Sequence, residues 1–149
     1  MTATAIDHLN FTVNSFDESA EWYGRVFGFR VVERQVDEGL PWGVLRSDDG
    51  AGGSMLCIYE APQRELLDRF ALRDRGQHGF AHFGVRIRDE AAWLQTLQRE
   101  NLQVLYGGVV EWPHSKSWYI KDPTGYEIEV ALWNEDRVSF EGAAMEPSE

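Results

Sequence analysis

The chain contains an internal repeat, which constrains its fold more than any single segment does. Asp7–Val13 aligns with Ala81–Ile87, and both segments place a histidine at their second position, His8 and His82. In each segment polar and apolar residues alternate, which is the period of a β-strand with one apolar face. The repeat therefore predicts two similar modules that pair with each other.

The first module is predicted over residues 6–60, in the order β-α-β-β-β. The helix is expected to begin after Ser15 or Asp17 and to end at Gly28, because these residue types satisfy the backbone groups that helix ends leave unpaired. The expected strands are Ile6–Val13, Phe29–Val36, Trp42–Arg46 and Ser54–Glu60, with a turn at Asp48–Gly53.

The second module is predicted over residues 80–133. It follows a connector at residues 61–79 with a short helix around Glu65–Arg73, and a small acidic tail at residues 134–149 is expected to fray. The expected elements are strands Phe80–Ile87, Gln103–Val109, Ser117–Lys121 and Tyr126–Leu132 and a helix at Asp89–Glu100. The last two strands flank Asp122-Pro-Thr-Gly125, where Pro and Gly suit a turn.

A module of this kind covers one face of its sheet with its own helix and leaves the other face open. We therefore expect an α+β fold, in which two βαβββ modules form a curved mixed β-sheet cup with helices outside and polar faces inside. The length of 149 residues is that of one domain.

Composition excludes several classes of function. The net charge of −11 comes without a basic cluster, which argues against binding to nucleic acid or to anionic membranes. No apolar run approaches the ~20 residues of a membrane span, and the first residues lack the basic and apolar regions of a signal peptide. The chain has 1 cysteine, so it forms no internal disulfide. We expect a cytoplasmic protein with a small-molecule substrate.

Three residues on the polar faces of otherwise apolar strands form the candidate site. If both modules curve the same way, His8, His82 and Glu129 point into the cup. Two imidazoles and one carboxylate are a facial ligand set for Fe(II), Mn(II), Zn(II) or Ni(II) that leaves positions open for substrate or water. A single strand histidine is more often a surface or hydrogen-bonded residue, so the metal hypothesis depends on the three occurring together.

The sequence resembles the vicinal oxygen chelate superfamily. This group includes glyoxalase I, extradiol dioxygenases, fosfomycin-resistance proteins, methylmalonyl-CoA epimerase and bleomycin-resistance proteins. The resemblance covers residues 6–133 and lies in Asp7-His-Leu, Trp22-Tyr, Val26-Phe-Gly-Phe29, Ala81-His-Phe and, most specifically, Tyr119-Ile-Lys-Asp-Pro-Thr-Gly-Tyr-Glu-Ile-Glu129. It implies paired βαβββ modules, a divalent metal at His8, His82 and Glu129, and a homodimer.

Within the superfamily, the ligand types resemble those of the extradiol dioxygenases. This implies Fe(II), a substrate with two adjacent oxygens, and catalytic roles for Tyr119 and His114. Tyr119 would hydrogen-bond a reaction intermediate and His114 would move a proton. The alternatives are a structural aromatic at Tyr119 and a solvated loop histidine at His114.

Other activities remain open. Glyoxalase I-like members use a carboxylate ligand on the last strand of the first module, where this chain has Cys57, whose role is undetermined, and Glu60 is out of phase with it. Val109 stands where some fosfomycin-resistance enzymes place a lysine. The alternatives are a lyase, isomerase or thiol transferase on the same scaffold, or a metal-free drug-binding protein. Four aromatic residues suggest a flat or apolar ligand, with core or dimer contacts as the alternative: Trp42, Tyr59, Trp112 and Trp118. Trp118 is out of phase with Tyr119, so it is expected to pack under the helices.

Overall fold

The computed structural model describes residues 3, 5–47, 53–134 and 138–140. Most of the predicted turn at Asp48–Gly53 and most of the predicted tail lie outside these ranges. The chain divides into two compact units, Met1–Leu66 with Asp122–Gly125, and Leu67–Lys121 with Tyr126–Glu149. In the described part of the chain, no helix is both long and apolar enough to cross a membrane.

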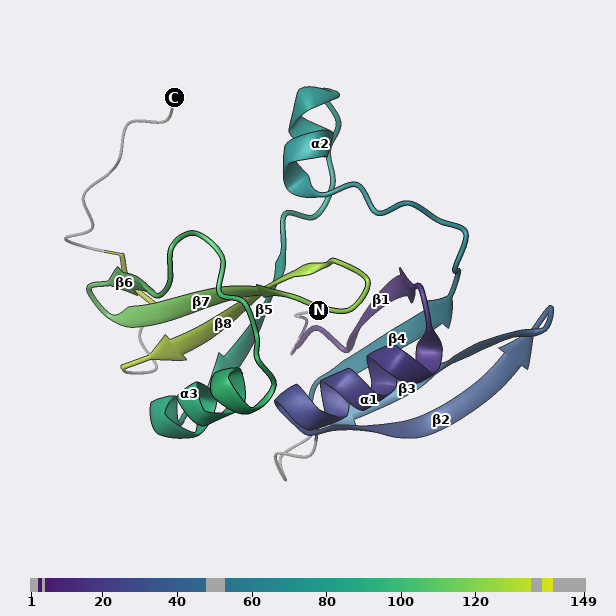
Figure 1. Ribbon diagram of the computed structural model, residues 1–149, viewed down its shortest axis with the longest axis horizontal. Helices are drawn as coiled ribbons and strands as arrows, with labels where there is room; N and C mark the ends of the chain where they lie inside the picture. The colour runs from purple at the N-terminus through teal and green to yellow at the C-terminus, as the bar shows by residue number, and fades with distance from the viewer. Residues whose placement is uncertain (1–2, 4, 48–52, 135–137, 141–149) are drawn as a thin grey trace. The chain divides into compact units, whose positions relative to one another are not determined.

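The first unit holds a four-stranded sheet and one long helix (Figure 1). The strand order is β1-β4-β3-β2, in which β1 and β4 run parallel and the other pairs antiparallel. The elements are β1 His8–Val13, α1 Phe16–Phe27, β2 Phe29–Asp37, β3 Leu40–Ser47 and β4 Met55–Glu60.

Helix α1 begins and ends where the sequence predicts. Its N-cap is Ser15, whose side chain accepts a hydrogen bond from the N–H of Glu18, and Gly28 ends it with φ 73°. The helix contacts β2, β3 and β4 and buries Trp22, Tyr23 and Val26 toward them. These side chains recur at helical spacing, so one face of the helix forms the core of the unit.

The second unit has the same architecture with an added helix. Its sheet has the order β5-β8-β7-β6, with β5 and β8 parallel. The elements are α2 Arg69–Asp74, β5 Phe83–Ile87, α3 Glu90–Arg99, β6 Val110–Trp112, β7 Ser115–Lys121 and β8 Glu127–Trp133. Asp89 caps α3, and Asp68 caps the short connector helix α2.

The repeat extends to strand register. Asn10 lies opposite Cys57 in the parallel pair of the first unit, and Gly84 lies opposite Glu129 in that of the second. Asn10 and Gly84 each come two residues after the repeated histidine, so Cys57 and Glu129 occupy equivalent places. The predicted α+β fold of two βαβββ modules is confirmed, with one four-stranded sheet in each unit.

The strand predicted at Gln103–Val109 is wrong. Tyr106, Gly107 and Gly108 have φ angles of 56°, 82° and 124°, which an extended strand does not adopt. The segment forms turns, anchored by a hydrogen bond from the N–H of Leu105 to the carbonyl of Tyr119, and the strand begins only at Val110. The first strand of the second module also begins later than predicted, at Phe83, so His82 directly precedes it.

A buried hydrogen bond joins α1 to the turn Asp122–Gly125 within the first unit. The hydroxyl of Tyr23 donates to the Asp122 carboxylate at 2.9 Å, and both residues are buried. The other oxygen of Asp122 accepts from the N–H of Gly125 at 2.8 Å. Both oxygens of this buried carboxylate are therefore satisfied from the protein.

Replacing Tyr23 by Phe should destabilise the protein by about 1–3 kcal/mol, because it leaves one oxygen of a buried carboxylate without its donor. Urea denaturation followed by far-UV circular dichroism measures this change. Tyr59→Phe is the matched control, since the Tyr59 hydroxyl makes no hydrogen bond within the described residues. Equal stability of Tyr23→Phe and Tyr59→Phe would contradict the importance of this bond.

Candidate functional site

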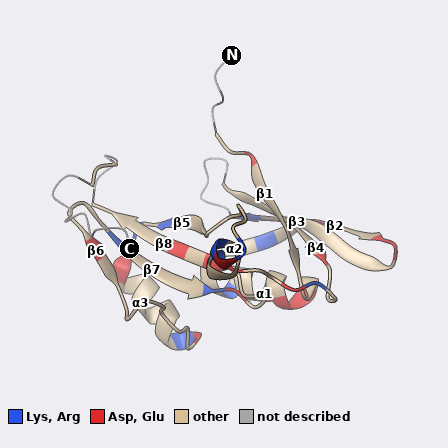
Figure 2. Cartoon of the chain, turned by 90° about the horizontal axis from the view of Figure 1, so that it is seen from above, with Lys and Arg blue, Asp and Glu red and all other residues tan. Residues whose placement is uncertain are grey.

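Two glutamates of β8 lie on the same side of the strand. Side chains alternate along a strand, so Glu127 and Glu129 share one face, and the acidic stretch of β8 is red in Figure 2. Glu129 lies opposite Gly84 of β5 and opposite Tyr119 of β7. Because Gly84 carries no side chain, the space beside Glu129 on this face is open to His82, two residues earlier.

His82 and Glu129 are in direct contact. The Nε2 atom of His82 lies 2.9 Å from Oε2 of Glu129, and the buried hydroxyl of Ser117 donates to Oε1 of Glu129 at 2.6 Å. The His82 and Glu129 side chains keep 26% and 23% of their surface exposed. A nitrogen donor and an oxygen donor thus lie side by side where solvent reaches them.

Glu127 is a neighbour of the His82–Glu129 pair that sequence reasoning missed. Its side chain is only 8% exposed. Its Oε2 accepts a hydrogen bond from Tyr106 at 2.5 Å, whereas its Oε1 is buried and has no hydrogen-bond partner. Oε1 lies 3.7 Å from Nδ1 of His82 and 3.8 Å from Nη1 of Arg69. The alternation of β8 was the signal that could have found it, since it places Glu127 beside Glu129.

The Nδ1 atom of His82 is also buried without a hydrogen-bond partner. Two unsatisfied polar atoms therefore face each other across 3.7 Å, the His82 Nδ1 and the Glu127 Oε1. Nε2 lies at hydrogen-bond distance from the Glu129 carboxylate, so it donates its proton there in the metal-free protein. If a metal took the place of that proton, a small rotation would let Nδ1–H donate to Glu127 instead.

Tyr119 of β7 lies next to His82 and Glu129. Its ring contacts those of His82 and Tyr106 at centroid distances of 5.4 Å and 5.3 Å. Burial, followed by the negative charge of Glu129, raises the pKa of Tyr119 to about 12. Tyr119 therefore keeps its proton at neutral pH and can donate a hydrogen bond.

The remaining predicted residues lie elsewhere. His8 belongs to the first unit, where its Nδ1 lies 2.8 Å from the Asp7 carboxylate and its side chain is 46% exposed. His114 is in the turn between β6 and β7, and its carbonyl accepts from the N–H of Asn134. Within the described residues, no group of three or more His, Cys, Asp or Glu side chains is arranged to hold a metal ion. The structure brings together His82, Glu129 and Tyr119.

The first module lacks a carboxylate at the place equivalent to Glu129. Cys57 is half-buried there, and burial raises the pKa of its thiol, which keeps the thiol neutral. Glu60 has a structural contact, because its Oε2 accepts a hydrogen bond from the N–H of Phe16 at 2.8 Å, at the start of α1. Neither side chain presents a free anionic ligand.

The residues of the second unit fit a divalent cation. Imidazole nitrogen and carboxylate oxygen are ligands of Fe(II), Mn(II), Zn(II) and Ni(II), and here they are preset side by side. The unpartnered Nδ1 of His82 and the nearby Glu127 match the arrangement in which a metal-bound histidine directs its other ring nitrogen toward a carboxylate.

Comparisons with known proteins agree on the family and the fold. Residues 5–130 match the family model of the Glyoxalase/Bleomycin resistance protein/Dioxygenase superfamily. No curated protein matches the chain. A glyoxylase/bleomycin resistance protein/dioxygenase domain from Frankia sp. EAN1pec superposes with a TM-score of 0.71 at 15% identity, covering 91% of this chain and 96% of that one.

Two further solved structures share this fold. A glyoxalase family protein from Enterococcus faecalis gives a TM-score of 0.68 at 14% identity, covering 86% of this chain and 97% of that one. The trypanothione-dependent glyoxalase I of Leishmania major gives 0.62 at 16% identity, covering 89% and 88%. At these identities the likeness shows the fold alone.

The raised pKa of Tyr119 can be tested in the metal-free protein. Glu129→Gln should lower the pKa of Tyr119 from about 12 toward its ordinary value of 10.0 without reaching it, because burial is the larger cause. Since the folded state binds this proton more tightly than the unfolded chain, stability should fall as the pH rises from about 10 to 12.

The ¹³C NMR shift of the tyrosine Cζ, assigned with Tyr119→Phe, measures the pKa of Tyr119. Glu111→Gln on β6 is the control, and an equal shift in both variants would exclude Glu129 as a cause.

Proposed function

The chain belongs to the Glyoxalase/Bleomycin resistance protein/Dioxygenase superfamily, and we propose that it is a divalent-metal-dependent enzyme acting on a small molecule with two adjacent oxygens. The reaction we favour is that of an extradiol dioxygenase with Fe(II), with Mn(II), Zn(II) or Ni(II) as the other metals considered. The observation that carries the proposal is the contact between His82 and Glu129, which presets two ligands of different type beside a protonated tyrosine.

His82, Glu129 and His8 would hold the metal. His82 and Glu129 come from the second module, and His8 comes from the first module of this chain or of a second copy, as in the homodimer we expect. A divalent metal held there would supply Lewis-acid chemistry for a substrate with two adjacent oxygens.

The side chains around the metal have separate roles. Ser117 donates to Glu129 and so fixes the orientation of this carboxylate. Tyr119 is protonated and donates a hydrogen bond to a substrate oxygen. His114 is proposed to move a proton, because an imidazole can both accept and donate one.

Other reactions on the same scaffold are a lyase, an isomerase or a thiol transferase. A glyoxalase I-like reaction is disfavoured by the neutral Cys57 thiol, which stands where those enzymes have a fourth ligand and base. A metal-free drug-binding protein is the second candidate, favoured by the aromatic pair Trp42 and Tyr59 on the sheet of the first module. The cytoplasmic location remains a prediction.

Metal content tests the proposal first. The protein purified without tag or chelator should retain about one divalent metal ion per chain, and Ala at His8, His82 or Glu129 should remove it, because each change deletes a ligand. His78→Ala is the matched control, since His78 is exposed in the connector before β5. Elemental analysis measures the metal and circular dichroism verifies folding. Metal retained by all three variants would exclude this ligand set.

Oxygen uptake with a panel of catechols, on the same samples, identifies the reaction. Iron with uptake supports the dioxygenase. Zinc or nickel without uptake contradicts it and redirects the search to lyase and isomerase substrates. If no metal is retained and no divalent ion restores binding, the drug-binding candidate replaces the enzyme.

Glu127 is proposed as a positioning residue for His82. Glu127→Gln should weaken metal binding by about 10–100-fold, because the carboxylate that would accept from Nδ1–H of the metal-bound His82 is lost. In the zinc-loaded protein the ¹H NMR signal of the His82 Nδ1–H should move upfield in Glu127→Gln, as its acceptor loses its charge, which a merely structural role would not produce. Glu33→Gln on the exposed strand β2 is the control. An unchanged Nδ1–H signal in Glu127→Gln would refute the role.

A further inference from the structure

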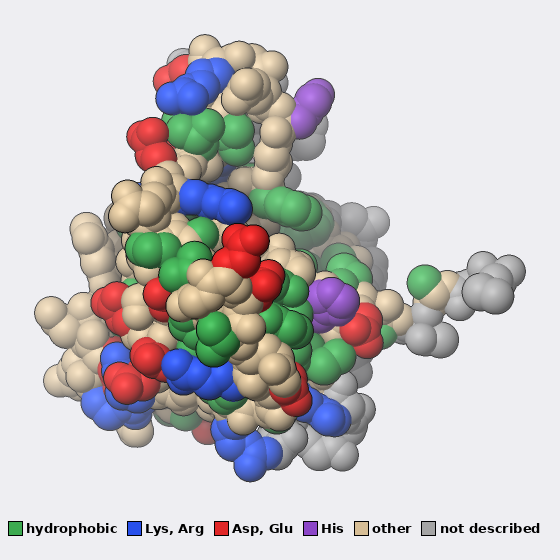
Figure 3. Space-filling view, turned by 90° about the vertical axis from the view of Figure 1, so that its right-hand side faces the viewer, with side chains coloured by type: hydrophobic (Ala, Val, Ile, Leu, Met, Phe, Trp, Pro, Cys, Tyr) green, Lys and Arg blue, Asp and Glu red, His purple; other side chains and the backbone are tan. Residues whose placement is uncertain are grey.

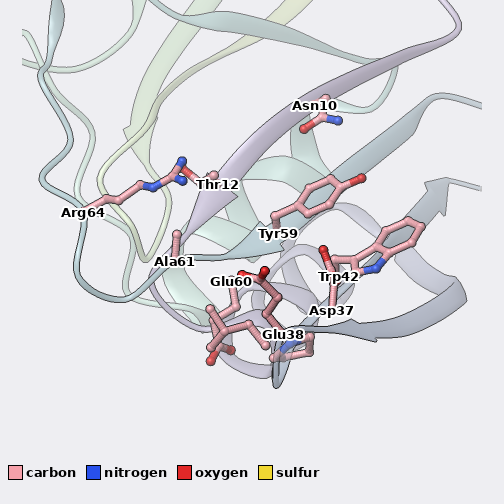
Figure 4. A pocket seen from close by; sticks show the side chains of 11 residues that line it. Asn10, Thr12, Asp37, Glu38, Trp42, Tyr59, Glu60, Ala61 and Arg64 are labelled. Carbon is pink, nitrogen blue, oxygen red and sulfur yellow. The ribbon is translucent and has the colours of Figure 1, made fainter.

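The first module contains a pocket of its own, of about 350 Å³. This volume is at the small end of the range of about 300–1,000 Å³ found for ligand sites. Figure 4 shows its lining, which comes from β1, β3, β4 and the hairpin between β2 and β3. The side chains that matter for the argument are Asn10, Thr12, Trp42, Tyr59, Asp37 and Glu38.

One side of the pocket carries a stacked aromatic pair. Trp42 and Tyr59 are direct neighbours across β3 and β4, with ring centroids 5.1 Å apart and an angle of 4° between their planes. Each ring covers part of one face of the other, and both are only half-buried, so part of the pair remains accessible. The outer face of the pair is the platform on which another flat group can stack.

The charges around the platform are mostly negative. Asp37, Glu38 and Glu60 line the pocket, against one guanidinium from Arg64, which reaches in from the other side (Figure 4). One oxygen of Glu60 is taken by the N–H of Phe16. In the part of the chain that the structure describes, the side-chain carboxylates of Asp37 and Glu38 have no hydrogen bond or ion pair, so their charge is available to a ligand.

A tight turn fixes the backbone from which the two unpaired carboxylates project. Asp37 pairs with Leu40, and Glu38 and Gly39 between them have φ angles of 48° and 83°. Two residues with positive φ make the hairpin turn whose twist matches its strands. Figure 3 faces the end of the molecule where this hairpin lies and shows carboxylates among hydrophobic side chains and a few cations.

From these observations we propose that the pocket binds a flat organic cation, an aromatic ring that carries an ammonium or amidinium group. The ring stacks on the outer face of the Trp42–Tyr59 pair, and aromatic faces attract positive charge. The negative charge of Asp37 and Glu38 favours a positively charged ligand over a negatively charged one. Because both carboxylates are exposed, they contribute to specificity more than to affinity. Asn10 and Thr12 supply an amide and a hydroxyl for hydrogen bonds.

The pocket also has a place in the proposed enzyme. Asn10 and Thr12 lie on the same face of β1 as His8, because side chains alternate along the strand. The pocket would then bind the part of the substrate that is distant from its two adjacent oxygens. This last step rests on the proposed function, whereas cation binding by the pocket does not.

Three naphthalene probes that differ only in charge test the proposal: 1-naphthylmethylamine, 1-naphthalenemethanol and 1-naphthoate. Isothermal titration calorimetry is performed on the full chain with EDTA, so that no metal takes part. The amine should bind about tenfold more tightly than the carboxylate at low salt, and this preference should shrink in about 0.5 M salt as the carboxylates are screened. Equal binding of the three probes, or preference for the anion, would overturn the proposal.

Variants assign the binding to this pocket. Trp42→Leu should weaken binding of the amine by about tenfold or more, because stacking is lost, and Trp42→Phe should retain part of the binding. The double change Asp37→Asn with Glu38→Gln should abolish the preference for the amine and leave the neutral probe unaffected. Trp112→Leu on β6 is the control for a lost tryptophan. Amine binding that survives in Trp42→Leu would refute the site.

One further variant separates this inference from the proposed function. His8→Ala should lose metal while binding the amine as before. If the protein retains metal but the amine does not bind, the pocket inference fails alone. If the amine binds with the expected preference but no metal is retained by any sample, the enzyme proposal fails alone.

Discussion

The parallel pairing between the first and last strands of each module positions the chemistry of this protein. β5 and β8 are distant in sequence, and a parallel pair needs a long crossover, which α3, β6 and β7 provide. The pairing sets Gly84 opposite Glu129, so His82 comes within 2.9 Å of that carboxylate. A shift of one residue in this register would turn Glu129 to the apolar face and destroy the contact.

The pairing also creates an electrostatic problem. Glu127 and Glu129 are two carboxylates on one strand face, and their mutual repulsion and loss of water both cost free energy. Glu129 is compensated by Ser117 and His82, whereas Glu127 has one hydrogen bond from Tyr106 and a more distant guanidinium. The second module therefore concentrates negative charge on one face, where a cation is the natural complement.

Much of this fold could be predicted from the sequence, because alternation and helix caps are local properties. Ser15 and Gly28 bound α1 as their chemistry requires, and the β5–β8 register follows from the repeat. The segment before β6 could not be predicted in this way, since apolar residues there suggested a strand while Tyr106 adopts positive φ without being glycine. Glu127 was missed because its burial depends on Tyr106 and Arg69, which come from other segments. How His8 relates to the pair in the second module depends on how modules assemble, which no local pattern encodes.

The neutral thiol at Cys57 makes the two modules chemically unequal. Cys57 and Glu129 hold equivalent places in a repeated architecture, yet one is a half-buried thiol whose pKa is raised by burial and the other is a carboxylate. At this position only the second module offers an oxygen ligand. In the first module the same end of the architecture carries the pocket with the stacked Trp42 and Tyr59 instead.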